Sequence, residues 1–277
     1  MIKKGASIFV AGLLCMVGCS SVSANPGTGT VTTTPPAASP CLSITVPAYF
    51  STLSIWQTAV ADSPWNSKVS RIMILNPNSG PGTAADPSNQ TLVTTVHNAG
   101  GKVYGYVPTG YGADALTTVE AEIQDYISWY KVDGIFLDET AQDASFVSTY
   151  YQPLATYITS NISGGGVMLN PGLYPDPSYA AITVPSISSL KIVVFEHDYA
   201  TFTGSTAAMP TWAASYPSSL FVDIVYDTPA ASVANALSLA VQRNVGMVYL
   251  TDPTLPNPYT TLPSYWTTLT QSTQAGC

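Results

Sequence analysis

Charged and metal-binding side chains are scarce in this chain of 277 residues. It has eight Lys and Arg against sixteen Asp and Glu, two His and four Cys. A protein that binds nucleic acid by neutralising phosphates needs a basic surface, so the formal charge of -8 argues against that class. Neither a Cys-x-x-Cys nor a Gly-x-Ser-x-Gly motif is present. We therefore expect no nucleic-acid partner, no cofactor and no metal site.

The first 40 residues predict export rather than a folded domain. Residues 1–18 hold two lysines and then an apolar run, Ile8–Met16, that is too short to span a bilayer, as in a signal peptide. The run ends in Met-Val-Gly-Cys, which resembles the lipobox of bacterial lipoproteins and predicts lipidation of Cys19. Ordinary cleavage after Ala24 is the alternative. Residues 19–40 are rich in Ser, Thr, Gly and Pro, have no charge and predict a flexible linker.

This pattern predicts an outer-membrane or cell-surface lipoprotein, or otherwise a periplasmic or secreted protein. A lipid on Cys19 would be its only contact with a membrane. Loss of residues 1–18 removes two lysines and no acid, which takes the charge from -8 to -10.

Two further cysteines bracket the expected folded domain, residues 41–277. Cys41 and Cys277 are the first and last residues of that domain. In an oxidising compartment such a pair is most simply a disulfide that joins the ends of the domain. A metal site is the weaker alternative, because neither cysteine has a neighbouring His or Cys.

Short apolar runs alternate with helical patterns through this domain. Most runs are continuous, as in Ile192-Val193-Val194-Phe195, which is typical of parallel strands covered on both faces. The expected strands are Leu42–Ala48, Ser70–Leu75, Lys102–Val107, Gly134–Asp138, Val167–Asn170, Lys191–Glu196, Leu220–Tyr226 and Gly246–Thr251. The expected helices are Gln90–Ala99, Leu116–Tyr130, Phe146–Ser160, Ala230–Gln242 and Ser264–Thr273, with weaker patterns after Ala48, Asn170 and Glu196.

Eight strands, each followed by a helix-sized segment, favour an α/β fold, a single (β/α)8 barrel of the TIM type. A doubly wound open sheet is the alternative. That fold would need a Gly-rich phosphate turn after the first strand, and Pro47-Ala48-Tyr49-Phe50 offers none.

Acidic residues end two of the expected strands, where barrel enzymes carry their chemistry. Asp138 and Glu139 follow an apolar strand, and Glu196 ends another. Glycoside hydrolysis requires two carboxyl groups that flank one bond, one as acid and the other as nucleophile or base. We therefore expect these three acids to be catalytic, although acids at such positions also cap helices.

Polar and aromatic residues at the other strand ends predict a sugar-binding rim. Aromatic rings with a polar edge stack on sugar faces. Each ring alone suits core or rim packing as well, so the prediction rests on the cluster. The expected substrate-binding residues are Tyr49, Asn76, Asn78, Tyr106, Tyr111, Asn170, His197, Tyr226, Asp227 and Asp252.

Several motifs resemble the spherulin-4-like glycoside hydrolases. They are residues 46–50 (Val-Pro-Ala-Tyr-Phe), 74–82 (Ile-Leu-Asn-Pro-Asn-Ser-Gly-Pro-Gly), 105–112 (Gly-Tyr-Val-Pro-Thr-Gly-Tyr-Gly) and 129–139, which end in Asp-Gly-Ile-Phe-Leu-Asp-Glu. The resemblance implies a (β/α)8 barrel that cleaves α-1,4 linkages in galactosamine-containing polysaccharide, such as the galactosaminogalactan of fungal biofilms. It also implies that Asp138 is the nucleophile, Glu196 the acid/base and Glu139 a supporting group, with retention of configuration. The roles of Asp138 and Glu139 stay interchangeable.

The leading hypothesis is therefore an exported, monomeric, endo-acting glycoside hydrolase of an amino-sugar polymer. Its acidity would attract a partly deacetylated, cationic polymer, although acidic exported proteins are common. A non-catalytic barrel lipoprotein that binds surface polysaccharide is one alternative. A hydrolase of another α-linked glycan is the other.

Overall fold

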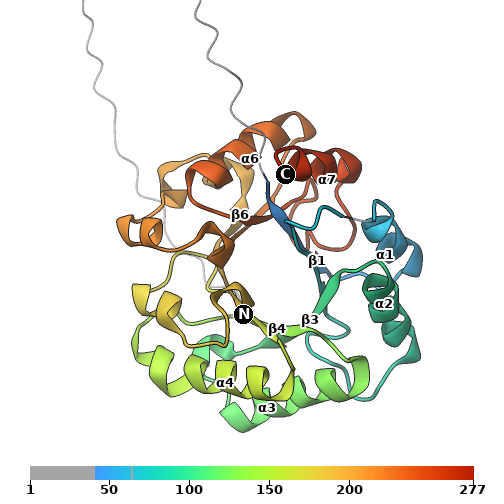
Figure 1. The fold of residues 1–277 in the computed structure, drawn as a ribbon, viewed down its shortest axis with the longest axis vertical. Coiled ribbons are helices and arrows are strands. Elements are labelled where there is room, and N and C mark those ends of the chain that lie inside the picture. The colour runs from blue at the N-terminus through green and yellow to red at the C-terminus, as the bar shows by residue number, and fades with distance from the viewer. Residues whose placement is uncertain (1–40, 64) are drawn as a thin grey trace, which may run out of the picture. The chain divides into compact units, whose positions relative to one another are not determined.

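The computed structural model describes residues 41–63 and 65–277. Eight parallel strands form a closed barrel in chain order, from β1 to β8, and β1 pairs with β8 (Figure 1). This confirms the prediction of a (β/α)8 barrel and excludes the open doubly wound sheet. The predicted signal peptide 1–18, the lipidation of Cys19 and the linker 19–40 lie outside the described residues.

The strands are buried along almost their whole length, because helices and loops cover the outside of the barrel and side chains fill its interior. Every residue of β2, β5 and β8 is buried, as the continuous apolar runs predict. The strands are β1 (Ser43–Ala48), β2 (Arg71–Leu75), β3 (Lys102–Pro108), β4 (Gly134–Asp138), β5 (Gly166–Leu169), β6 (Leu190–Asp198), β7 (Phe221–Tyr226) and β8 (Met247–Leu250).

The helices form the outer ring of the barrel, as Figure 1 shows. They are α1 (Leu53–Val60), α2 (Pro87–Asn98), α3 (Leu116–Asp125), α4 (Gln152–Asn161), α5 (Tyr199–Phe202), α6 (Val233–Gln242) and α7 (Trp266–Gln274). A π-helical turn, Tyr126–Tyr130, extends α3, and another, Val147–Tyr151, precedes α4. The two long helices of the sequence prediction therefore have nearly the expected extent.

The outer ring is irregular after β5 and β6, where the helical patterns of the sequence are weak. Only a 3-10 turn, Pro177–Ala181, and another short turn follow β5, and α5 has four residues. The connection after β5 holds four prolines (171, 175, 177 and 185), and proline removes the backbone N–H that a helix interior needs. After β6, α5 ends two residues before Gly204, and glycine is a poor helix former. None of the helices in the described part of the chain is long and apolar enough to cross a membrane.

The two ends of the domain meet at the amino-terminal end of the barrel. A disulfide joins Cys41 and Cys277, whose Cα atoms are 4.9 Å apart. The backbone N–H of Leu42 donates to the carbonyl of Thr273 at 2.8 Å, which ties the start of β1 to α7.

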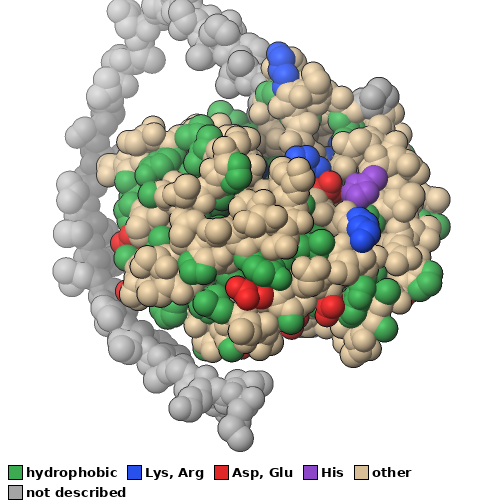
Figure 2. Space-filling model, turned by 60° about the horizontal axis from the view of Figure 1, so that its bottom comes forward, with side chains coloured by type: hydrophobic (Ala, Val, Ile, Leu, Met, Phe, Trp, Pro, Cys, Tyr) green, Lys and Arg blue, Asp and Glu red, His purple; other side chains and the backbone are tan. Residues whose placement is uncertain are grey.

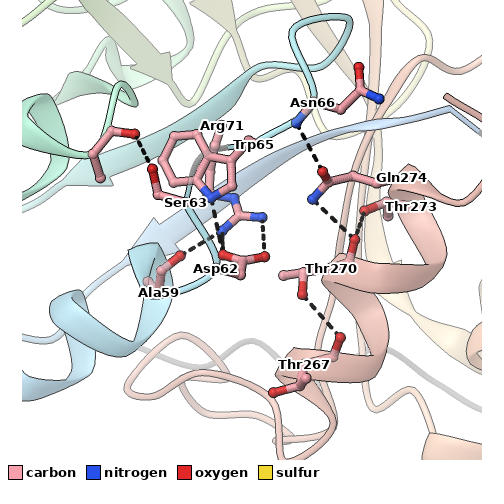
Figure 3. Close-up of polar contacts among 11 residues, drawn as sticks. Ala59, Asp62, Ser63, Trp65, Asn66, Arg71, Thr267, Thr270, Thr273 and Gln274 are labelled. Atoms are coloured by element: carbon pink, nitrogen blue, oxygen red, sulfur yellow. Dashed lines mark hydrogen bonds and ion pairs between the residues drawn. The ribbon is translucent and has the colours of Figure 1, made fainter.

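A buried arginine organises the same end of the barrel (Figure 3). Arg71, at the start of β2, forms an ion pair with Asp62 and donates to the carbonyl oxygen of Ala59 at 2.9 Å. Its guanidinium lies over the ring of Trp65, 4.3 Å from the centroid. Nearby, Gln274 of α7 accepts a hydrogen bond from the backbone N–H of Asn66 at 3.1 Å. This hydrogen bond attaches the last helix to the loop between α1 and β2, which the contacts of Arg71 hold in place.

Candidate active site

Four neighbouring strands each contribute a polar side chain to the mouth of the barrel. Tyr106 comes from β3, Asp138 ends β4, Asn170 follows β5 and Glu196 lies near the end of β6. The carboxyl ends of parallel strands meet at one rim of a barrel, so these side chains gather there.

Asn170 links the two acidic side chains. Its Nδ2 donates to Oδ1 of Asp138 at 2.7 Å and to Oε2 of Glu196 at 2.5 Å. The backbone N–H of Gly172 donates to Asn170 Oδ1 at 3.1 Å, which keeps the amide nitrogen turned toward the carboxyl groups. Because one nitrogen bonds both acids, the two bonded carboxyl oxygens are separated by about 5 Å at most.

A tyrosine hydroxyl holds the other oxygen of each acid. Tyr106 donates to Oδ2 of Asp138 at 2.7 Å, and Tyr259 donates to Oε1 of Glu196 at 2.6 Å. The ring of Tyr49 stands between them and makes edge-on contacts with both tyrosine rings, at centroid distances of 5.6 and 5.5 Å. The two carboxyl groups are therefore oriented by donors on both sides.

The surroundings of Glu196 favour its protonated form. Burial and then the nearby Asp138 charge raise its pKa above the usual value, and hydrogen bonds from Tyr259 and Asn170 oppose that shift. Burial, followed by the charges of the acids, also raises the pKa of Tyr106 and of Tyr259. Both phenols therefore stay protonated and act as hydrogen-bond donors. An acid with a raised pKa beside a second carboxyl group suits general acid catalysis.

Glu139 lies beside this pair in a left-handed backbone conformation with φ of 50°. Its carbonyl oxygen accepts hydrogen bonds from the Thr109 hydroxyl at 2.8 Å and from the Tyr111 backbone at 2.7 Å. Non-glycine residues in this region are strained and are often found at functional sites. Among the described residues, the Glu139 carboxylate has no hydrogen-bond partner.

A cavity of about 360 Å³ opens above the two linked acids. Tyr49, Asp138, Glu196 and Tyr226 form its floor and sides, and the loop 255–259 between β8 and α7 covers one wall. The residues that line this cavity come from five strand ends or loops. A ligand in the cavity can reach both carboxyl groups.

The structure brings many of the predicted residues together. Tyr49, Tyr106, Asn170 and Tyr226 contact the acids or line the cavity above them. Asn76 lies beside it, in a neighbouring cavity.

Other predicted residues lie farther out on the rim. His197 is exposed and its ring stacks on Tyr226 at a centroid distance of 5.8 Å. Tyr111 is 64% exposed. Asn78 and Asp227 are exposed and line neither cavity, whereas Asp252 accepts hydrogen bonds from the backbone and hydroxyl of Ser264. Roles for these residues in substrate binding stay predictions.

Tyr259 is the site residue that the sequence prediction missed. It lies nine residues beyond the end of β8, in a loop that folds back over the barrel mouth. The sequence prediction rests on residues directly after each strand, and a tyrosine inside a Pro-rich loop has no periodicity to mark it. Its only signal was its place in the connection that follows a barrel strand.

Lysine and arginine side chains lie at one end of the barrel, where the strands begin. Each Lys and Arg of the described residues lies at or just before the start of a strand: Lys68, Arg71, Lys102, Lys131, Lys191 and Arg243. On the face shown in Figure 2, the few basic side chains lie toward one side of the surface. The carboxyl-end rim therefore combines several acids with His197 and with no Lys or Arg from the described part of the chain. Those residues also include no cluster of three or more His, Cys, Asp or Glu arranged to hold a metal.

The fold and the site together define a (β/α)8 barrel with paired carboxyl groups at the mouth. Residues 43–273 match the family model named Spherulation-specific family 4. The chain belongs to this family, which confirms the resemblance drawn from its motifs. It is 33% identical over 236 residues to spherulin-4 of Physarum polycephalum, an alignment that covers 81% of this chain and 68% of that protein.

Solved structures share the same barrel. Sph3 of Aspergillus clavatus, crystallised in complex with GalNAc, matches with a TM-score of 0.72 and 22% identity, over 85% of this chain and 98% of Sph3. The spore cortex-lytic enzyme SleL of Bacillus cereus matches with a TM-score of 0.53 and 11% identity, over 85% of this chain and 75% of SleL. At these identities the matches establish the fold.

Proposed function

We propose that this protein is an endo-acting glycoside hydrolase that cleaves α-1,4 linkages in a galactosamine- or N-acetylgalactosamine-containing polysaccharide. The observation that carries the proposal is the Asn170 bridge between Asp138 and Glu196 below a cavity. Bonded carboxyl oxygens no more than about 5 Å apart suit a retaining mechanism, whereas inverting enzymes need about 6.5–9.5 Å between the carboxyl groups for an intervening water.

In the first step, protonated Glu196 donates its proton to the glycosidic oxygen while Asp138 attacks the anomeric carbon. The bond to the leaving sugar breaks and a glycosyl ester of Asp138 forms. In the second step, the Glu196 carboxylate takes a proton from water, the resulting hydroxide attacks the anomeric carbon, and Asp138 leaves as a carboxylate. Glu196 is then protonated again and ready for the next cycle.

The neighbouring donors have distinct parts in these steps. Tyr106 and Asn170 orient the nucleophilic Asp138, and their hydrogen bonds stabilise its negative charge when the ester breaks. Tyr259 orients Glu196 toward the leaving oxygen. Glu139 supports the site as a second carboxylate beside the nucleophile. In the alternative mechanism, Glu139 is the nucleophile and Asp138 is the supporting group.

Two observations support an amino-sugar substrate. The related Sph3 barrel was crystallised with GalNAc. The rim of this chain bears acids and no Lys or Arg from the described part of the chain, which suits a polymer that carries protonated amines. We also propose export through the signal sequence in residues 1–18, with a lipid anchor on Cys19.

The decisive experiment is the release of oligosaccharides from purified galactosaminogalactan by the wild type and by Asp138→Asn, Glu139→Gln and Glu196→Gln. Internal cleavage should vanish in folded Asp138→Asn and Glu196→Gln, and proton NMR of the first product should show the α anomer. A wild type that binds the polymer without cleaving it would instead indicate a binding barrel. Cleavage of a different α-glycan alone would overturn the amino-sugar assignment.

A further inference from the structure

A second cavity lies beside the acid site and shares one wall with it. It measures about 300 Å³ and opens at the carboxyl ends of β1 and β2 and at the first turn of α2. Tyr49 lines both cavities. A ligand long enough to occupy both would therefore pass over the ring of Tyr49.

Polar groups without partners line this second cavity. Asn89 is only 7% exposed, and among the described residues its side-chain amide has no hydrogen-bond partner. Asn76 accepts a bond from the Gly80 N–H at 3.1 Å through Oδ1, and its Nδ2 faces no partner in the described part of the chain. Because these amides face the cavity and not the sealed interior, they can exchange water for the hydroxyl groups of a ligand.

One carboxylate accompanies these amides. Asp86 caps α2 by accepting a hydrogen bond from the Ser88 N–H at 2.8 Å through Oδ1. Its Oδ2 is not engaged by any described residue. Asp86 is also the single charged residue that lines the cavity in the described part of the chain. The lining thus offers amide donors and acceptors for hydroxyl groups and one negative charge for a cation.

We propose that this cavity is a second sugar subsite, which binds the hexosamine adjacent to the one cleaved and prefers a free amino group over an acetamide. The inference rests on the proposed function, because it assigns this cavity to the same polymer chain. Its volume is at the lower end of the range for ligand pockets, about 300–1,000 Å³, which suits a single monosaccharide. The protonated amine of a hexosamine at this position pairs with Asp86, while the hydroxyl groups of the same sugar form hydrogen bonds with Asn76 and Asn89.

The chain supplies a matched control for Asp86. Asp86 and Asp176 both begin an Asp-Pro-Ser sequence, and each accepts a hydrogen bond from the serine N–H two residues later, at 2.8 and 2.9 Å. Asp176 lines neither cavity. Asn is a good helix N-cap, so Asp86→Asn and Asp176→Asn both keep the cap while they remove the charge.

The test compares kcat/KM of the purified protein on fully deacetylated and fully acetylated α-1,4-galactosamine oligosaccharides. Exposed ion pairs are weak, so Asp86→Asn should lower the value about two- to fivefold on the deacetylated oligomer and leave the acetylated one unchanged. Asp176→Asn should change neither value. Asn89→Ala should lower both values, and thermal unfolding should show that each variant is folded.

The outcomes separate this inference from the proposed function. If the wild type cleaves the oligomers and Asp86→Asn behaves like Asp176→Asn, the subsite is wrong while the hydrolase stands. An equal loss on both oligomers would overturn the preference for a free amine. If the wild type cleaves neither, the proposed function fails. Calorimetric titration with the deacetylated oligomer then tests the subsite proposal. The proposal is wrong if Asp86→Asn binds the oligomer as tightly as the wild type does.

Discussion

One nitrogen of Asn170 holds both acids of the site: Nδ2 lies 2.7 Å from Oδ1 of Asp138 and 2.5 Å from Oε2 of Glu196. This shared donor sets the distance between the two carboxyl groups and connects the ends of β4 and β6 through the residue that follows β5. The geometry of the candidate site therefore depends on a neutral amide as much as on the acids.

Removal of this amide should disable the proposed enzyme without unfolding the barrel. We expect Asn170→Ala to lower kcat/KM about ten- to a hundredfold, because hydrogen bonds to charged groups contribute about 1.5–3 kcal/mol each. Steady-state kinetics on galactosaminogalactan measures the loss. Asn98→Ala, at an exposed position at the end of α2 that lines neither cavity, is the control and should retain wild-type activity. Equal activity of the two variants would contradict the positioning role.

Tyr259 should control the pH range of activity. Its hydrogen bond lowers the pKa of Glu196 against the larger effect of burial, so Tyr259→Phe should raise that pKa further. If Glu196 is the general acid, activity is lost as pH rises through its pKa, and the alkaline limb of the kcat/KM profile should move to higher pH.

The control for this shift is Tyr111→Phe, since Tyr111 is 64% exposed and its hydroxyl has no partner among the described residues. Its pH profile should match that of the wild type. A Tyr259→Phe profile with an unmoved or lowered alkaline limb would show that Tyr259 does not act through Glu196.

A second buried acid, away from the site, should make stability depend on pH. Asp223 of β7 is 2% exposed, and its Oδ2 has no hydrogen-bond partner among the described residues. Burial raises its pKa to about 8, and the charge of Arg243 opposes that shift. The unfolded carboxyl ionises near pH 4, so the folded protein binds the extra proton between about pH 4 and pH 8.

Stability should therefore fall as pH rises through that window. Asp223→Asn should be more stable than the wild type at pH 7.5 by an amount that shrinks as the pH falls toward 4.5. Urea unfolding of both proteins at the two pH values measures the difference. A stability difference independent of pH would mean that Asp223 stays ionised in the folded protein.

Loss of the disulfide should weaken the whole barrel while the acid site stays intact. The Cys41–Cys277 bond closes a loop with a sequence separation of 236 residues, and removal of a native disulfide typically costs about 2–5 kcal/mol. The double variant Cys41→Ser, Cys277→Ser should unfold at lower urea concentration and keep its kcat/KM at 25 °C, because the bond lies at the opposite end of the barrel from the acids. Unchanged stability would show that the hydrogen bonds of Leu42 and Gln274 suffice to hold the chain ends.

Much of the barrel could be predicted from local patterns. Continuous apolar runs such as Ile192–Phe195 mark strands that are buried on both faces, and the order of strands in a closed barrel follows from their order in the chain. The connections after β5 and β6 were harder to predict, because their prolines and glycine favour short turns over the helices that the barrel pattern suggests.

The sequence by itself determined the eight strands and placed Asp138, Glu139 and Glu196 at strand ends, because the apolar runs that mark such strands and the residues that follow them are local features of the chain. Only the tertiary structure decided which donors the acids meet. Tyr259 donates a hydrogen bond to Glu196, which lies 63 residues earlier in the sequence. Asn89 lines a cavity at the ends of β1 and β2 and the start of α2. Such contacts depend on how loops fold back over the barrel mouth and on which side chains then fill it, and neither follows from the periodicity of the sequence.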